Sequence, residues 1–481
     1  MTFALAPGVS LRTTAAGRFL VAERPLRAAR VNEVLHRLLG GAAPVAPATR
    51  GEVRALEALA RAGYLERVEQ GGGAVPRDRG GWPSVTVVIP VKDRAGELQR
   101  CLASLGRLSY PRERLDVVVV DDGSRDESPA VARAHGARVV PSGGRGTGPA
   151  SARNRGAREA RGELLAFVDS DCTAAPAWLA ELVERFDDPQ VGAVGGRVVG
   201  MHCATRLDRY EAGMSSLSLG NRELSGREGD DTFYLPSCNL LVRRAAFLAA
   251  GGFREGLHVG EDVDLTWRLR DLGYRLVYVP RGWVYHEHRN RLGAFLRRRF
   301  EYGTSEALLQ EHHPGRRKKL AAPPGLAAAL AWGLAALLGA GWPALAAAAG
   351  VLAVDAYRAR ARFERAGLAL GPLRALACRA RAAGSLAYYV GCHAFRYYGW
   401  PLLLASLLVP RFGAVALALF LGVAAVDRRV RRVTLGFPSF LFYYLGEQLA
   451  YGAGAFWGCV RHGSFRSYRP QVSGRAEMSF T

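Results

Sequence analysis

A chain of 481 residues is too long for one ordinary domain and fits two or three. Hydrophobic residues make up 49% of it and charged residues 22%, which excludes a disordered chain. Lysine and arginine exceed aspartate and glutamate by 22, and almost all of the surplus is arginine, because the only lysines are Lys92, Lys318 and Lys319. Such a surplus has to face an anionic partner, namely nucleic acid, anionic lipid or a phosphorylated substrate.

The cysteines and the N-terminus indicate a reducing compartment. The seven cysteines are scattered and contain no CxxC pair, which argues against a disulfide framework or a structural zinc site. The first thirty residues lack the continuous apolar core of a signal peptide. We therefore expect the soluble part of the chain to lie in the cytosol.

A small domain is predicted at residues 1–72. It combines strand-like runs at 9–13 and 18–23 with apolar residues at helical spacing in 28–41 and 50–68. A segment rich in glycine and proline follows, and we predict a linker at 73–83.

Residues 84–312 predict an α/β domain. Strand-like and helix-like segments alternate, with strands at 85–90, 116–122, 137–141 and 163–171 and helices at 95–108, 128–136 and 148–162. This alternation predicts a mostly parallel sheet covered on both faces, and ligands of such sheets bind beyond the carboxyl ends of the strands. Acids follow three of these ends, at Asp93, Asp121-Asp122 and Asp169/Asp171. We therefore expect a functional site there.

Residues 313–481 contain two long apolar stretches. The first has no charge from Leu320 to Val354, and the second, at 399–426, has one charge, Arg411. Their length and the tryptophans and tyrosines around them predict membrane-associated helices. A buried helical hairpin of a soluble protein is the alternative interpretation.

The arginines around these stretches predict their topology. Basic clusters lie at 316–319, 358–381 and 428–432, and short arginine-rich loops stay on the cytoplasmic side. Each apolar stretch should therefore enter the membrane and return to the cytoplasmic side as a helical hairpin, with turns at 341–343 and 410–413. The halves have roughly 11–22 residues where a full span needs about 20, so some arms would only dip into the bilayer. Two single spans, with the loop 358–381 outside, are the alternative.

The run from Leu164 to Val168 ends abruptly in Asp169-Ser170-Asp171. One interpretation is a strand end followed by a helix cap. The other is a metal site for an anionic ligand, because hard oxygen ligands suit Mg²⁺ or Mn²⁺. A sugar nucleotide is such a ligand, since its diphosphate has to be neutralised when the sugar is transferred.

Glu261 and Asp262 lie at a predicted helix start. Sugar transfer needs a base for the proton of the acceptor hydroxyl, and a helix N-terminus stabilises a carboxylate. Asp262 should therefore be ionised at neutral pH. Ordinary capping of the first helical turn is the alternative reading of both acids.

Five motifs together resemble one enzyme family. "VTVVIPVKDR", "VVVVDDGSRD", "GPASARNRG", "FVDSD" and "GEDVDLTWRLRDLGYRLVYVP" have the order and spacing of the inverting family-2 glycosyltransferases, which have the GT-A fold. The resemblance implies a nucleotide-sugar donor and a divalent metal, Mg²⁺ or Mn²⁺, with no nucleic-acid partner. It implies these roles: catalytic base Asp262; metal-binding D-x-D Asp169 and Asp171; nucleotide-sugar contacts Pro90, Asp93, Asp121, Asp122, Arg153, Asn154, Asp169 and Glu261.

Two further positions leave alternatives open. His286 and His288 lie two residues apart on a predicted strand and face the same side, so His286 is either a further metal ligand, as in some relatives, or polar surface. Residues 296–300 lie where processive relatives carry Q-x-x-R-W, but here only Arg299 of that motif is present. Arg299 either holds phosphate of the donor or lies on a basic, membrane-facing helix.

Residues 1–72 resemble in pattern the PqqD-like peptide-recognition domains of ribosomal peptide modification systems, or else a generic winged-helix module. With the two following regions, the chain is similar to the mycofactocin-system glycosyltransferases. That implies transfer of glucose from UDP-glucose to a redox cofactor precursor made from a short peptide. β-Linked oligosaccharide would form at the cell membrane, with the catalytic domain on the cytoplasmic side. The alternative is a membrane glycosyltransferase acting on a polyprenyl phosphate or cell-envelope polysaccharide.

Overall fold

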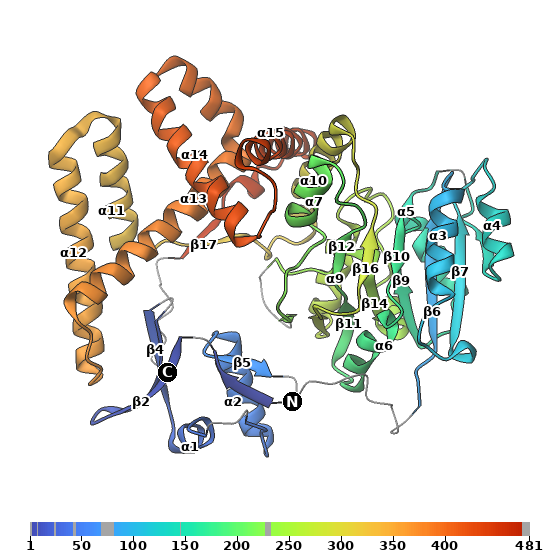
Figure 1. The fold of residues 1–481 in the computed structure, drawn as a ribbon, viewed down its shortest axis with the longest axis horizontal. Coiled ribbons are helices and arrows are strands. Elements are labelled where there is room, and N and C mark those ends of the chain that lie inside the picture. The colour runs from blue at the N-terminus through green and yellow to red at the C-terminus, as the bar shows by residue number, and fades with distance from the viewer. Residues whose placement is uncertain are drawn as a thin grey trace.

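The computed structural model describes residues 2–6, 8–23, 26–41, 45–68, 81–144, 146–226 and 232–473 (Figure 1). Most of the segment predicted as a linker, 73–83, falls outside these residues. An N-terminal module, an α/β domain and a set of C-terminal helices follow one another along the chain.

The N-terminal module contains two small sheets and two helices. Strands β2 (Val9–Thr14), β3 (Gly17–Glu23) and β4 (Leu26–Val31) form an antiparallel sheet, and β1 (Thr2–Leu5) pairs with β5 (Leu65–Val68). The helices are α1 (Glu33–Leu39) and α2 (Arg50–Arg61).

Two helix predictions in this module are partly wrong. Residues 26–31 pair with β3 as a strand, and α1 starts only after Asn32, whose side chain accepts a hydrogen bond from the Leu35 backbone. The helix predicted at 50–68 ends at Arg61, because Gly63 adopts a φ of 72° and the chain then enters β5. Strand pairing has outweighed the helical spacing of the apolar residues in both cases.

The α/β domain is built on an eight-stranded sheet in the order β13-β15-β11-β14-β9-β6-β7-β8. The strands are β6 (Val85–Val91), β7 (Leu115–Asp121), β8 (Arg138–Pro141), β9 (Leu164–Phe167), β11 (Val191–Gly195), β13 (Leu224–Gly226), β14 (Leu240–Arg243) and β15 (Arg275–Tyr278). Neighbours β9, β6, β7 and β8 run parallel, as do β11 and β15, whereas β14 runs antiparallel between β9 and β11. The predicted mostly parallel sheet is confirmed.

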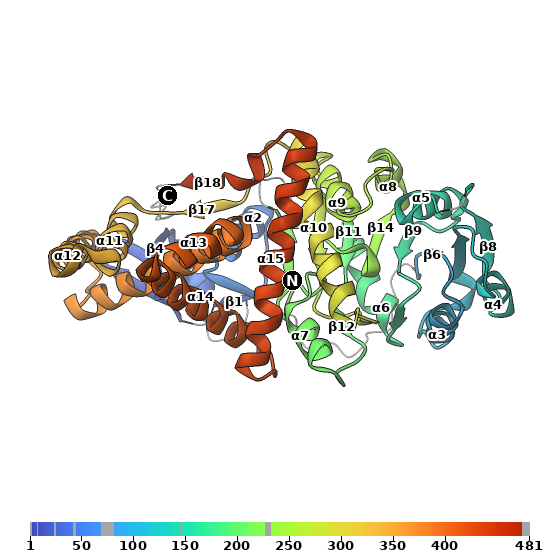
Figure 2. The same cartoon turned by 90° about the horizontal axis from the view of Figure 1, so that it is seen from above.

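Helices cover both faces of this sheet (Figure 2). They are α3 (Ala95–Leu105), α4 (Ser128–Ala134), α5 (Pro149–Glu159), α6 (Trp178–Val183), α8 (Arg244–Ala249) and α9 (Glu261–Asp271). Successive residues of β6 separate two hydrophobic cores, since Val87 and Ile89 pack with α3 and α6 whereas Val88 packs with α5. Helix α5 lies very close to the sheet at Gly156, where an added Cβ would meet the Val88 side chain at 2.4 Å.

A second, three-stranded sheet in the order β10-β16-β12 lies beside the end of β9. Its strands are β10 (Cys172–Ala174), β12 (Val198–Gly200) and β16 (Val284–His286), and the nearby helix α7 spans Arg206–Met214. Helix α10 (Leu292–His312) then packs along α15 (Phe437–His462). At Gly454 an added Cβ would meet the Phe300 carbonyl oxygen at 2.0 Å, so the two helices need a glycine to approach this closely. The C-terminal helices are thus fixed to the α/β domain.

The apolar stretches form two helical hairpins. Helix α11 (Pro324–Ala335) lies beside α12 (Gly341–Arg365), and α13 (Pro372–Leu408) returns as α14 (Pro410–Val430) (Figure 1). The chain reverses at Gly339, which has a φ of 129°, and at Val409. These reversals lie within a few residues of the predicted turns. By length and composition alone, 324–365 and 410–430 are apolar enough to cross a membrane.

The N-terminal module packs on the base of these hairpins. Phe19 and Ala28 join a hydrophobic cluster with Phe363 and Leu368 near the α12–α13 connection. The short strands β17 (Lys319–Ala321) and β18 (Gln471–Ser473) pair with each other beside the hairpins.

Candidate active site

The carboxyl ends of β6 and β9 open into a cavity of about 1140 Å³. Ten of the predicted site residues line it: Pro90, Asp93, Asp122, Arg153, Asp169, Asp171, Glu261, Asp262, His286 and Arg299. The other two, Asp121 and Asn154, do not line it. The wall opposite the sheet comes from α10, α15 and residues 466–470. Ten of the twelve predicted site residues therefore lie together in the fold.

Asp169 lies just beyond β9 and is held by Arg153 of α5. The Arg153 Nη2 donates to Asp169 Oδ1 at 2.6 Å, and its Nη1 donates to Glu261 Oε1 at 2.9 Å. Burial opposes the ionised form, but the neighbouring guanidinium holds the pKa of Asp169 below its ordinary value. Asp169 is thus ionised, and Arg153, only 3% exposed, ties the end of β9 to the start of α9.

Asp171 lies beside a histidine from the neighbouring strand. β10 and β16 pair antiparallel with Cys172 opposite His286, and His286 Nε2 is 3.6 Å from Asp171 Oδ1. The ligand atoms of Asp171, Cys172 and His286 all lie within 4.8 Å of one another. The ring of His288 lies 4.8 Å from that of His286, so both histidines face the same side, as predicted.

These residues fit a divalent cation such as Mg²⁺ or Mn²⁺. Asp171 Oδ1 and His286 Nε2 converge, while Oδ2 is taken by Arg94, whose Nη1 donates at 2.5 Å. The buried Nδ1 of His286 has no hydrogen-bond partner among the described residues. Burial raises the pKa of the Cys172 thiol well above its ordinary value, and a protonated thiol is a poor ligand for a hard cation. The predicted metal set therefore divides: Asp171 and His286 lie together, and Asp169 is bound to Arg153.

Asp93 and Asp121 hold the loops beyond β6 and β7. Asp93, which has a φ of 51°, accepts a hydrogen bond from the Arg125 backbone at 2.7 Å, and Asp121 accepts one from the Ser124 backbone at 2.9 Å. Their side chains thus hold the loops at this end of the cavity, and of the two only Asp93 lines it.

Asp122 fixes the loop that precedes α5. Its Oδ1 accepts hydrogen bonds from the hydroxyls of Ser142 and Thr147, at 2.7 and 2.6 Å, and its Oδ2 accepts one from the Gly148 backbone at 3.0 Å. Burial opposes the ionised form, but these donors lower the pKa of Asp122. Most of its hydrogen-bonding capacity is therefore used inside the protein.

Asn154 points away from the cavity. Its amide nitrogen donates to the Phe253 carbonyl at 2.8 Å, and its carbonyl oxygen accepts from the Phe253 backbone at 2.8 Å. Adjacent residues of a helix point in directions about 100° apart, so Arg153 faces the cavity and Asn154 faces the 253 loop. That Asn154 lies near a nucleotide stays a prediction, and its side chain here joins α5 to the 253 loop.

Asp262 lies in the first turn of α9, after Gly260 in the left-handed conformation. Its Oδ2 accepts a hydrogen bond from the Ser237 backbone at 3.2 Å. Burial and the charge of Glu261 raise the pKa of Asp262 to about 7. The expectation of a fully ionised carboxylate at neutral pH is thereby corrected, because burial outweighs the helix N-terminus. A carboxylate with such a pKa suits general base catalysis near neutrality.

The raised pKa of Asp262 predicts the pH dependence of any reaction in which it is the base. Only the ionised form accepts a proton, so kcat/KM should fall about tenfold per pH unit below about 7 and level off above it. In Glu261→Gln the carboxylate that raises the pKa of Asp262 is gone, so the acid limb should move to lower pH. Initial rates between pH 5 and 9 measure both profiles, and a flat profile below pH 7 would contradict the assignment.

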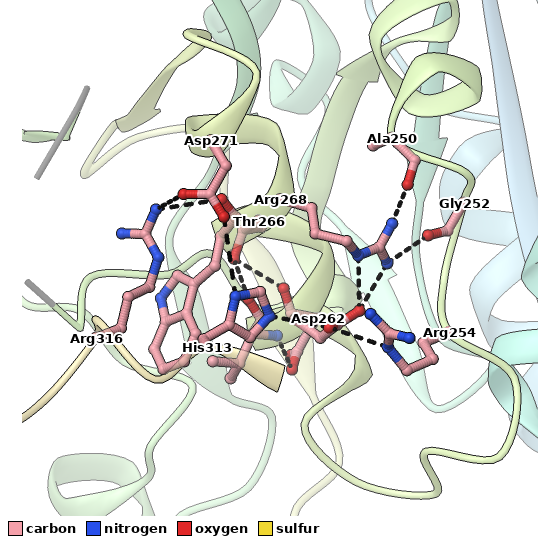
Figure 3. Close-up of polar contacts among 12 residues, drawn as sticks. Ala250, Gly252, Arg254, Asp262, Thr266, Arg268, Asp271, His313 and Arg316 are labelled. Carbon is pink, nitrogen blue, oxygen red and sulfur yellow. Dashed lines mark hydrogen bonds and ion pairs between the residues drawn. The ribbon is translucent and has the colours of Figure 1, made fainter. Parts of the chain in front are cut away.

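Asp264 was missed by the sequence analysis although it lies in "GEDVDL". It is fully buried and bound by Arg254 at 3.2 Å, Arg268 at 2.6 Å and His313 at 3.0 Å. Figure 3 shows these three partners together with Asp262. Burial opposes ionisation, but these partners lower the pKa of Asp264 far below its ordinary value. Asp264 thus anchors α9 and sets the position of Asp262. The sequence feature that could have identified Asp264 is that it is the third acid in this motif.

Arg299 lies on the cavity wall and is only 4% exposed, so the membrane-facing alternative is wrong for this residue. Its Nη2 donates to Glu211 Oε1 at 2.6 Å, and its Nε lies 3.5 Å from Glu447 Oε2. It therefore joins α7, α10 and α15 at the edge of the cavity.

Comparisons with known proteins identify the chain as similar to glycosyltransferases. Residues 86–249 match the model of the family described as "Glycosyl transferase family 2". The chain is 37% identical over 399 residues to the pre-mycofactocin glycosyltransferase of Mycobacterium tuberculosis strain H37Rv, an alignment that covers 81% of this chain and 82% of that protein. It is 30% identical over 233 residues to glycosyltransferase AglE of Haloferax volcanii, covering 47% and 73%.

Among solved structures, the chain is similar to the mannosyltransferase PcManGT from Pyrobaculum calidifontis in complex with GDP-Man and Mn²⁺. The identity is 23% and the TM-score 0.38, and the match covers 63% of this chain and 87% of that one.

Proposed function

The chain belongs to glycosyltransferase family 2, and we propose that this enzyme transfers glucose from UDP-glucose to pre-mycofactocin, a peptide-derived redox cofactor precursor, and builds a β-linked oligosaccharide. The alignment with the pre-mycofactocin glycosyltransferase, which spans most of both chains, carries the acceptor assignment. The cavity beyond the β-strands, with Asp171, His286 and Asp262 in it, supports the chemistry.

The donor binds with its nucleotide toward the loops beyond β6 and β7 in this proposal. Lys92 and Asp93 line that end of the cavity. Asp171 and His286 would hold a divalent cation, which would supply the positive charge that neutralises the diphosphate of the leaving group. Arg153 keeps Asp169 ionised beside this site.

Asp262 acts as the base on the acceptor. Its carboxylate takes the proton of the acceptor hydroxyl as that oxygen forms a bond to the anomeric carbon of the donor. The bond from this carbon to the diphosphate breaks at the same time, and the nucleoside diphosphate leaves with the electron pair. Attack opposite the leaving group inverts the anomeric centre. The anchoring of α9 through Asp264 supports this role, because a base has to be held in place.

We propose further that residues 1–72 recognise the peptide part of the acceptor, as the PqqD-like pattern implies. The module packs on the helical hairpins near the α12–α13 connection. Excess precursor peptide should then compete with pre-mycofactocin.

The experiment that tests the function uses the purified chain with UDP-glucose, Mn²⁺ and pre-mycofactocin. UDP release is measured with and without acceptor, and the product mass is determined. A mass gain in steps of one hexose is expected, together with inhibition by excess precursor peptide. Unchanged acceptor mass would refute the assignment, whereas gain without peptide inhibition would refute only the role of residues 1–72.

A polyprenyl-phosphate or polysaccharide glycosyltransferase is the second candidate. It is favoured by the apolar hairpins that follow the α/β domain. Transfer that requires added polyprenyl phosphate, with none to pre-mycofactocin, would favour it.

We propose that the hairpins enter the membrane from the cytoplasmic side. Large apolar side chains are exposed at both hairpin tips, including Leu337, Trp342, Leu407 and Leu408. Arg411 lies near Gly339, where an added Cβ would meet its Nη1 at 3.3 Å, so the two tips are neighbours.

This topology predicts the labelling of Arg365→Cys, a position at the exposed base of α12. A membrane-impermeant maleimide should not label it in intact cells and should label it after permeabilisation. The exposed Cys203 of the α/β domain is the internal control and should behave in the same way. Labelling of the thiol introduced by Arg365→Cys, but not of Cys203, in intact cells would instead support two single spans.

A further inference from the structure

The cavity is larger than one substrate needs. Sites for a single small molecule usually have about 300–1,000 Å³, whereas this one has about 1140 Å³. The predicted donor residues other than Arg299 lie on the sheet side, and the opposite wall is made by α10, α15, Arg317, Lys318 and residues 466–470. That wall carries a polar cluster to which the sequence motifs assign no role.

The cluster is centred on Glu306 of α10. Its Oε1 accepts hydrogen bonds from Lys318 Nζ at 2.6 Å, from the Tyr397 hydroxyl at 2.9 Å and from the Tyr451 hydroxyl. No hydrogen bond among the described residues reaches Oε2, although Glu306 lines the cavity. Burial opposes ionisation, but Lys318 lowers the pKa of Glu306. Glu306 is therefore a fixed, charged carboxylate in the cavity wall.

The residue before Glu306 on α10 lies close to the start of α9. An added Cβ at Gly260, two residues before Asp262, would meet Ser305 Oγ at 3.3 Å, and Ser305 precedes Glu306 on α10. Tyr234 also lines the cavity, and burial and the charge of Asp262 raise its pKa. Asp262 and Glu306 thus line one cavity from two helices that contact each other.

The presence of lysine rather than arginine at position 318 indicates a specific binding site. Only three lysines occur among 65 basic residues, and two of them, Lys92 and Lys318, line this cavity. Lysine supplies a compact point charge that the planar arginine fork cannot replace at a crowded position. Lys318 lies against the ring of Tyr397 at 4.6 Å while it binds Glu306. The cluster therefore orients the carboxylate.

We propose, on the basis of the proposed function, that this wall is the acceptor subsite and that Glu306 binds a second hydroxyl of the acceptor, so that the acceptor ends in a sugar. Asp262 takes the proton of the reacting hydroxyl, and Glu306 Oε2 accepts a hydrogen bond from another hydroxyl of the same sugar. The aromatic rings of Tyr234, Tyr302 and Trp267 also line the cavity and can pack against its apolar faces. An acceptor without a second hydroxyl leaves Glu306 unused.

The test measures initial rates of UDP release from UDP-glucose with Mn²⁺ and increasing cellobiose, a β-linked glucose disaccharide, as the acceptor probe. The unchanged protein should show a saturable, cellobiose-dependent rate. Glu306→Gln should raise the KM for cellobiose at least about tenfold, because a hydrogen bond to a charged group is lost. Its KM for UDP-glucose should stay near that of the unchanged protein. Glu311→Gln, an exposed position on the same helix outside the cavity, is the matched control.

A second variant covers the case in which Glu306→Gln does not fold. Glu306→Asp keeps the charge and shortens the side chain by one methylene, and it should raise the cellobiose KM by a smaller factor. The proposal would be overturned if the unchanged protein showed no cellobiose-dependent rate. It would also be overturned if the folded variants had a KM for cellobiose within twofold of the KM of the unchanged protein. Failure of the proposed function is seen separately, as absent transfer to pre-mycofactocin by the unchanged protein.

Discussion

Replacing Asp262 by asparagine is expected to lower kcat by about 10²- to 10⁴-fold while donor binding stays close to that of the unchanged protein. The amide has nearly the same shape and can keep the contact with the Ser237 backbone, but it cannot take a proton from the acceptor hydroxyl. UDP release with acceptor measures the loss, and calorimetric titration with UDP and Mn²⁺ measures binding.

Two further variants show whether the effect belongs to this carboxylate. Asp187→Asn makes the same change at an exposed position outside the cavity and should transfer at the normal rate. Asp262→Glu keeps the base but moves it by one methylene, so it should recover part of the rate and keep an acid limb in its pH profile. Near-normal turnover by Asp262→Asn would remove this residue as the base.

The location of this site could be predicted because it depends on a topological rule. Short apolar strands alternating with helices give parallel strands, whose carboxyl ends meet at one edge. Asp93, Asp122 and Asp169 were placed by that rule, and all three line the cavity. The direction of a neighbouring side chain was not predictable in the same way. Asn154 follows Arg153 in the sequence but turns to Phe253, because the helix rotates between them.

The chemical state of Asp262 also depends on packing that no motif encodes. The helix N-terminus favours its ionised form, yet burial and Glu261 raise its pKa to about 7. Likewise, β4 has a helix-like apolar spacing and becomes a strand because β3 offers it a hydrogen-bonding edge. In both cases a long-range contact outweighs the local signal.

The polar cluster in the cavity wall could not be predicted from the sequence either. Glu306, Lys318 and Tyr451 are separated by 12 to 145 residues, and the crossing of α10 and α15 brings Tyr451 to Glu306. That crossing depends on glycines, since Gly458 lies where an added Cβ would meet the Thr304 carbonyl oxygen at 2.5 Å. The glycines were visible in the sequence, but their partner helix was not.

Replacing Asp171 by alanine is expected to abolish the effect of the divalent cation on donor binding. Asp171 Oδ1 and His286 Nε2 are the two converging donor atoms, so the variant leaves the imidazole alone. Affinity for UDP should fall at least about tenfold in the presence of Mn²⁺ and change little in its absence. Titration of UDP at several Mn²⁺ concentrations, including none, measures UDP affinity with and without the cation.

Neighbouring variants distinguish a ligand from a structural residue. His286→Ala should also weaken the Mn²⁺ effect, whereas Cys172→Ala should leave it intact, because the buried thiol stays protonated. Asp169→Ala should weaken UDP binding by another route, since it leaves the buried Arg153 with Glu261 as its remaining carboxylate partner. The same Mn²⁺ dependence in Asp171→Ala as in the unchanged protein would exclude a cation between Asp171 and His286.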